Sequence, residues 1–250
     1  MPRLYCNAPI SVNTRMELPA SAARHAMVLR LKTDDEVTLF NGLGGEYTAK
    51  VVDLHRHGAT VDVLTFLDRE SELPYLVTLV QAIPENPKMD LVIEKAVELG
   101  VTRICAVESQ RSIVRLTEER AENRAARWKS IIISASEQCG RNRFAEVADI
   151  TTYRNWVTNL SPESFILLCP DAEVPLADWA LENPPHDVTL VIGPEGDFSP
   201  EEKDLAVRHG AVRLSLGPRI LRTETASIAA VSALTALWSR SDLKATEKVP

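Results

Sequence analysis

Apolar and polar residues alternate through much of the first seventy positions of the chain. The alternation is clearest over residues 36–40, 45–54 and 59–66, and a two-residue period is typical of strands with one buried face. Asn41-Gly42 and Gly44-Gly45 stand between the first two segments, where they predict tight turns. Short strands at such close spacing predict a small β-barrel.

One helix interrupts these strands. Residues 21–31 predict it, with Ser21 as the N-cap. The residues expected on its inward face are Ala22, Met27, Val28 and Leu31.

The rhythm changes from Tyr75 onward, where apolar residues form compact runs without polar alternation. These runs are residues 75–83, 102–107, 164–169, 187–193 and 212–217. Such runs are typical of strands that are covered on both faces. Helical patterns at 89–99 and 118–139 lie between them, and Thr117 is the expected cap of the second. The alternation predicts an α/β fold in which helices cover both faces of a mostly parallel sheet.

These patterns divide the chain into two domains. Residues 1–70 form the predicted barrel, and a polar linker follows at residues 71–75. Residues 76–243 form the α/β domain, and residues 244–250 form a polar tail.

Composition narrows the class of protein. No apolar run approaches the roughly 20 residues of a membrane-spanning helix, and residues 1–13 lack the apolar stretch of a secretory signal. A cytoplasmic location is therefore expected. The four cysteines stand far apart, and the one histidine pair at a metal-ligand spacing, His55 and His57, lies in a predicted strand-to-turn segment where a surface role is expected. No metal is therefore expected.

The net charge of −7 weakly disfavours a nucleic-acid partner. Its distribution points the other way, since residues 1–32 hold five basic side chains against Glu17 alone. Residues 103–143 hold nine basic side chains against five acidic ones. Either a basic RNA-binding face or ordinary solvated helix faces would explain these stretches.

The first segment with chemical content is residues 187–202. A buried strand ends at Ile192, and Gly193-Pro194-Glu195-Gly196 turns at its carboxyl end. Ser199, Pro200 and Glu202 then predict a helix that begins with a capping box. Ligands of α/β sheets bind at such turns because the backbone can approach them closely. From this segment alone, a plain strand–turn–helix connection is equally possible.

The second such segment is residues 212–238. A strand ends at Gly217-Pro218, and the chain then carries two arginines, two threonines and one glutamate before a helix begins. Small residues fill that helix over 226–238, which suits close packing or a subunit interface. A solvated loop followed by an ordinary core helix is the alternative.

Taken together, the two segments resemble the SPOUT superfamily of RNA methyltransferases. Residues 137–143 (EQCGRNR) are similar to a third signature, and the match is closest to the ribosomal RNA small subunit methyltransferase E family. The resemblance covers most of residues 75–238, with the barrel in the expected place before it. One departure is Asp197, which stands where that family usually has a second glycine. Aspartate tolerates left-handed turns better than most residues.

The resemblance implies a fold, a cofactor and an assembly. It implies a SPOUT domain with a trefoil knot, preceded by a PUA-like RNA-binding domain, in a homodimer. It also implies S-adenosyl-L-methionine bound among the knot loops. The expected cofactor-binding residues are Leu168, Gly193, Pro194, Glu195, Gly196, Leu216, Gly217, Ile220, Leu221, Arg222, Thr223 and Thr225.

The implied reaction is methylation of N3 of a uridine in 16S ribosomal RNA, either free or in the assembled small subunit. Arg222 is the expected stabiliser of negative charge on the base, and Glu224 is the expected proton acceptor. The expected RNA contacts are Arg3, Arg24, Arg30, Glu137, Asn142 and Arg143.

Two other functions stay open at this point. One is a SPOUT methyltransferase for another RNA, such as a transfer-RNA ribose 2′-oxygen. The other is a non-catalytic RNA-binding factor of ribosome assembly. The signature at 137–143 weighs against the first, and the intact charged segment at 219–225 weighs against the second.

Overall fold

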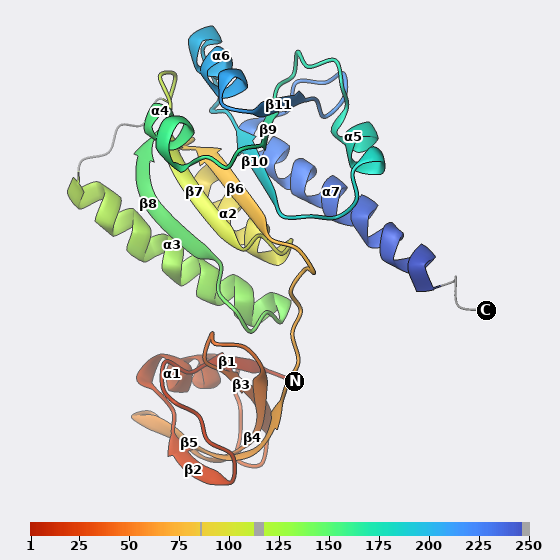
Figure 1. Cartoon of the computed structure of the whole chain (residues 1–250). Helices are drawn as coiled ribbons and strands as arrows, with labels where there is room; N and C mark the ends of the chain where they lie inside the picture. Colours follow the sequence, from red (N-terminus) through yellow and green to blue (C-terminus); the bar gives the residue numbers. More distant parts are fainter. Residues whose placement is uncertain (86, 113–117, 247–250) are drawn as a thin grey trace. The chain divides into compact units, whose positions relative to one another are not determined.

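The computed structural model describes residues 1–85, 87–112 and 118–246, and it forms two compact units (Figure 1). The first unit comprises Met1–Glu72 and Ile133–Phe144, and the second comprises Leu73–Ile132 and Ala145–Pro250. Residues 133–144, which the domain prediction assigns to the α/β domain, therefore pack within the first unit. The expected cap Thr117 and the end of the predicted tail, residues 247–250, lie outside the described residues.

The first unit is built on a five-stranded sheet in the order β1-β3-β4-β5-β2. Its elements are β1 (Arg3–Tyr5), β2 (Thr14–Glu17), α1 (Ala20–Val28), β3 (Glu36–Phe40), β4 (Glu46–His55) and β5 (Gly58–Leu67). The three strands predicted from alternation are confirmed, and their apolar positions form the core around Leu4, Val37 and Val61. Strands β1 and β2 escaped prediction because three or four residues are too few to show a period.

Helix α1 differs from its prediction at both ends. Pro19 occupies the N-cap position and makes no side-chain cap bond, so Ser21 lies inside the helix. The helix ends at Val28, and Arg30 takes a left-handed backbone conformation with φ of 57°. The inward face consists of Ala22, Ala23 and Ala26, whereas Val28 is 72% exposed. Three small side chains let α1 lie close to the sheet.

The second unit is built on six strands in the order β11-β9-β10-β6-β7-β8, and every neighbouring pair is parallel. The strands are β6 (Val77–Ala82), β7 (Arg103–Glu108), β8 (Glu146–Thr152), β9 (Phe165–Leu168), β10 (Val188–Ile192) and β11 (Ala211–Leu214). The predicted parallel sheet is confirmed. The edge strand β8 was missed because no compact apolar run marks it.

Helices cover both faces of this sheet. They are α2 (Lys88–Glu98), α3 (Glu118–Cys139), α4 (Tyr153–Asn155), the π-helix η1 (Trp156–Leu160), α5 (Leu176–Glu182), α6 (Pro200–Arg208) and α7 (Thr223–Thr246). Side chains such as Val80 and Val191 point to one face and pack with Trp156 and Phe198. On the other face, α7 contacts β10, α2 and α5. The trefoil knot that the resemblance implies stays a prediction.

Candidate functional site

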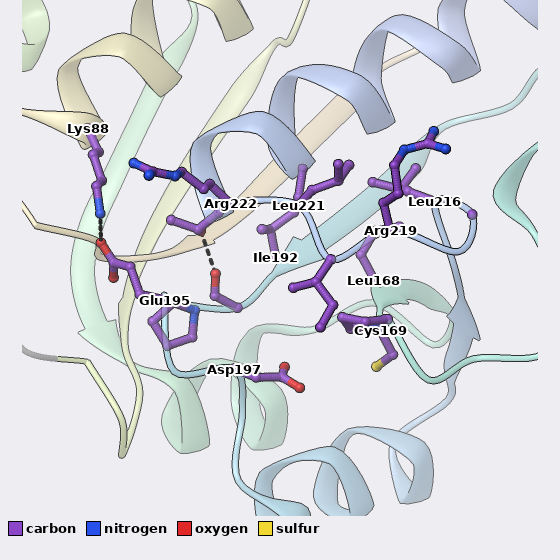
Figure 2. Close-up of a pocket in the computed structure, with 17 residues that line it drawn as sticks. Lys88, Leu168, Cys169, Ile192, Glu195, Asp197, Leu216, Arg219, Leu221 and Arg222 are labelled. Atoms are coloured by element: carbon purple, nitrogen blue, oxygen red, sulfur yellow. Dashed lines mark hydrogen bonds and ion pairs between the residues drawn. The ribbon is translucent and has the colours of Figure 1, made fainter.

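A cavity of about 400 Å³ lies at the carboxyl ends of β9 and β10, beside the segment that follows β11 (Figure 2). Leucine, isoleucine, proline and glycine form most of its wall, with charged side chains at several points. It is lined by Lys88, Leu168, Cys169, Pro170, Ile192, Gly193, Pro194, Glu195, Asp197, Leu216, Gly217, Arg219, Ile220, Leu221, Arg222, Thr223 and Ala226. The volume and the mixed lining are those of a small-molecule site.

The first wall is the turn after β10, and the predicted capping box of α6 holds it. The Ser199 hydroxyl accepts a hydrogen bond from the Glu202 backbone N–H, and the Glu202 carboxylate accepts one from the Ser199 N–H. The second oxygen of Glu202 accepts from the Gln110 N–H at 2.8 Å. One buried carboxylate thus joins the turn to the segment after β7.

Asp197 fits the turn despite standing where the resemblance suggests glycine. Its backbone is left-handed, with φ of 59°. One carboxylate oxygen accepts from the Phe198 N–H at 2.7 Å, and the other pairs with the Lys203 ammonium at 2.6 Å. Burial alone would lower the pKa of Lys203, but the bond to Asp197 raises it overall, so Lys203 stays protonated at neutral pH.

The second wall follows β11. Gly217 has φ of 93°, and a Cβ there would meet nothing within 4 Å, so conformation rather than crowding favours glycine. Helix α7 begins at Thr223, so Thr223, Glu224 and Thr225 lie in its first turn rather than in the predicted loop. The Ala226 N–H donates to the Arg222 carbonyl at 2.8 Å and closes that turn.

The two walls are joined by one short hydrogen bond. The Thr223 hydroxyl donates to the Gly193 carbonyl at 2.5 Å. Thr223 is buried. The start of α7 is therefore fixed to the end of β10.

Charged side chains gather at one end of the cavity. The Lys88 ammonium donates to the Glu195 carboxylate at 2.7 Å, and Arg222 extends toward the same end (Figure 2). The bond to Glu195 and the charges of Glu195, Glu224 and Glu85 raise the pKa of Lys88. Burial pushes the pKa of Glu195 upward, but Lys88 and backbone N–H groups lower it overall. Both groups are therefore charged at neutral pH.

Of the predicted catalytic pair, Arg222 lines the cavity and Glu224 does not. Arg222 is exposed and Glu224 is half-buried. One carboxylate oxygen of Glu224, Oε2, is buried and has no hydrogen-bond partner among the residues that the structure describes. A buried carboxylate oxygen without a donor is costly, so this atom is poised to accept a proton or a hydrogen bond.

Ten of the twelve predicted cofactor residues line the cavity. Gly196 and Thr225 do not. Gly196 packs against Arg111, whose guanidinium donates to the Gly196 carbonyl at 3.0 Å, and Thr225 is exposed. The lining residues outside the predicted list are Lys88, Cys169, Pro170, Ile192, Asp197, Arg219 and Ala226. Lys88 could have been found, because it follows the carboxyl end of β6 at the same edge of the sheet.

Three predicted RNA contacts are held inside the first unit instead. Arg3 forms an ion pair with Glu46 and donates to the Asn142 side-chain oxygen at 2.6 Å. Asn142 is fully buried, and Glu137 accepts from the Tyr5 N–H at 2.8 Å. Burial raises the pKa of Glu46, but the Arg3 bond and charge lower it overall, so the ion pair persists. These side chains hold the first unit together, and their contact with RNA stays a prediction.

The other three candidates remain accessible. Arg24 and Arg30 are exposed, and Arg143, also exposed, pairs with Glu70 at 3.2 Å.

Within the described ranges, no helix is long and apolar enough to cross a membrane. In the same part of the chain, no group of three or more His, Cys, Asp or Glu residues could hold a metal ion.

Comparison with known families defines the class. A model described as the RNA methyltransferase domain matches residues 71–235, and one described as the RNA methyltransferase PUA domain matches residues 18–64. With its parallel sheet and strand-end cavity, the chain is an RNA methyltransferase with an N-terminal PUA domain.

Individual relatives narrow this class. Ribosomal RNA small subunit methyltransferase E of Buchnera aphidicola (subsp. Schizaphis graminum) is 32% identical, over 94% of this chain and 95% of the relative. A crystal structure of that enzyme from Neisseria gonorrhoeae bound to S-adenosyl methionine is 39% identical, with a TM-score of 0.88, over 95% of this chain and 98% of the other. The chain belongs to the ribosomal RNA small subunit methyltransferase E family.

A further solved relative carries a ligand. A Legionella pneumophila structure in complex with the bound cofactor SAM is 36% identical, with a TM-score of 0.87, over 94% of this chain and 96% of the other.

Proposed function

We propose that this chain transfers the methyl group of S-adenosyl-L-methionine to N3 of a uridine in 16S ribosomal RNA. The observation that carries the proposal is the cavity, in which two glycine-containing turns and a charged end meet at the carboxyl edge of a parallel sheet. Family membership and two relatives solved with this cofactor support the same assignment.

The residues of the cavity fit that cofactor. Leu168, Ile192 and Leu221 offer apolar contacts to an adenine-sized group, and the backbone at Gly193 and Gly217 allows close approach. When bound, the cofactor supplies an electrophilic methyl group on a sulfonium. The chain itself must hold the base in line with that methyl group and remove the N3 proton.

Arg222 and Glu224 perform those steps in our proposal. The half-buried Glu224 carboxylate accepts the N3 proton, the N3–carbon bond forms as the carbon–sulfur bond breaks, and the proton then passes to water. Arg222 stabilises the negative charge that develops on the uracil oxygens.

The first unit contributes RNA binding through exposed basic side chains, Arg24 and Arg30 above all. We also propose a homodimer that uses α7. That helix buries Ser227, Ala230 and Leu234 within its own unit, and the small residues Ala229 and Ala233 on the other side stay partly exposed.

Gly193→Val should abolish tight cofactor binding. A Cβ at Gly193 would lie 3.3 Å from the Asp197 carboxylate and from the Phe198 ring, so the turn must shift. We expect affinity for S-adenosyl-L-methionine to fall about 100-fold, as crowding in a packed site implies. Calorimetry measures the affinity, and tryptophan fluorescence checks the second unit. The control is Gly58→Val in the first unit, where a Cβ would lie 3.2 Å from a Glu17 carboxylate oxygen. Undiminished affinity in Gly193→Val would remove the cofactor from this cavity.

Arg222→Ala and Glu224→Gln should slow methyl transfer on the order of 100- to 10,000-fold and leave cofactor affinity nearly unchanged. Single-turnover methylation across a pH series measures this. The rate of Glu224→Gln should recover as pH rises, because hydroxide can replace the missing base. Exposed Arg208 on α6 provides the control substitution, Arg208→Ala. A normal rate for Glu224→Gln at neutral pH would rule out its role as base.

Arg24→Ala and Arg30→Ala should each reduce the salt dependence of RNA binding by about one unit of slope. Filter binding at several salt concentrations measures the slope. Arg15→Ala should leave it unchanged, because the Arg15 guanidinium is already paired with Asp62 at 2.7 Å. An unchanged slope in the Arg24/Arg30 double variant would place RNA binding elsewhere.

A further inference from the structure

A buried glutamine lies behind the cavity without lining it. Gln81 is on β6, between β10 and β7 in the sheet, and its side chain is fully buried. Its side chain is polar, whereas the other buried residues of β6 are apolar: Val77, Leu79, Val80 and Ala82. An amide in such a place is costly unless each polar atom is bonded.

Both polar atoms of this amide make hydrogen bonds, and the partners determine which atom donates and which accepts. The Gln81 nitrogen donates to the Ala82 carbonyl at 2.8 Å and to the Thr223 hydroxyl oxygen at 2.9 Å. The Ser227 hydroxyl donates to the Gln81 side-chain oxygen. A flipped amide would set its oxygen against the Ala82 carbonyl, which can only accept, so the orientation is determined.

This orientation decides what the Thr223 hydroxyl does. A hydroxyl has one proton, and its oxygen already accepts from Gln81, so the proton is left for the Gly193 carbonyl at 2.5 Å. The chain of donors therefore runs from Ser227 through Gln81 and Thr223 to Gly193. It joins α7, β6 and the turn after β10.

We propose that Gln81 is a positioning residue for cofactor binding. Through Thr223, Gln81 ties the Gly193 turn to the start of α7 and so fixes the distance between two walls of the cavity. Gln81 itself does not line that cavity. The inference rests on the proposed cofactor site. This would raise the affinity for a ligand, because the walls of the cavity need no rearrangement when the ligand enters.

The test compares three substitutions. Gln81→Met keeps the volume and removes all three hydrogen bonds of the amide, Thr223→Val removes the hydroxyl, and Thr223→Ser keeps it. We expect Gln81→Met and Thr223→Val each to weaken cofactor affinity about 10-fold, the loss of one buried hydrogen bond. The double variant should lose no more than either single one, because both break the same chain. Thr223→Ser should bind within about twofold of the unsubstituted chain.

A purely structural role would give a different result. Ile104→Val, buried on β7 away from the cavity, should lower the melting temperature and leave affinity unchanged. If Gln81→Met behaves like Ile104→Val, or if its loss adds fully to that of Thr223→Val, the inference is overturned. If Gln81→Met does not fold, the cofactor affinities of Thr223→Val, Thr223→Ser and Ser227→Ala are compared instead. Equal affinity in these three variants would also overturn the inference. Failure of the cofactor site itself is separate, since it would appear as full affinity in Gly193→Val.

Discussion

The hydrogen bond from the Thr223 hydroxyl to the Gly193 carbonyl is the contact on which the candidate site depends. Thr223 and Gly193 are 30 residues apart in the chain, and each begins or ends the segment that forms one wall of the cavity. Neither segment has regular structure of its own, so little else fixes the distance between the walls. The rest of the unit supports this bond: the sheet places Gly193 at the end of β10, and buried Gln81 determines the direction in which Thr223 donates.

The charged end of the cavity follows a second constraint. Cations and carboxylates that lie close together must be paired or meet a ligand, since an isolated charge away from water is costly. Lys88 and Glu195 satisfy each other at 2.7 Å. Glu224 has a buried oxygen without a hydrogen-bond donor among the described residues. Arg222, two residues earlier in the chain, is exposed. Arg222 and Glu224 are the two groups to which our proposal gives the stabilisation of charge and the removal of the N3 proton.

Much of this architecture is readable from the sequence because it depends on local patterns. Apolar runs identify five of the six parallel strands, and Ser199 with Glu202 predicts the helix start that shapes the first wall. What local patterns miss depends on contacts between distant residues. Lys88 reaches the cavity only because α2 begins at the same sheet edge as the turn containing Glu195. Arg3 and Asn142 look like surface residues until the fold brings both against the Glu46 carboxylate. Gln81 looks like an ordinary strand residue, because no feature of the sequence around it predicts a contact with Thr223.

The central claim is that this site delivers a methyl group to N3 of a uridine, and the nucleoside product tests it most directly. The chain would be incubated with small-subunit ribosomal RNA, both free and as assembled subunits, that lacks the modification, together with cofactor labelled in its methyl group. The RNA would then be digested and analysed by mass spectrometry. Our account predicts the label in 3-methyluridine. Label in a 2′-O-methylated nucleoside, or no label from a chain that binds the cofactor, would contradict it and favour another methylation target or a non-catalytic role.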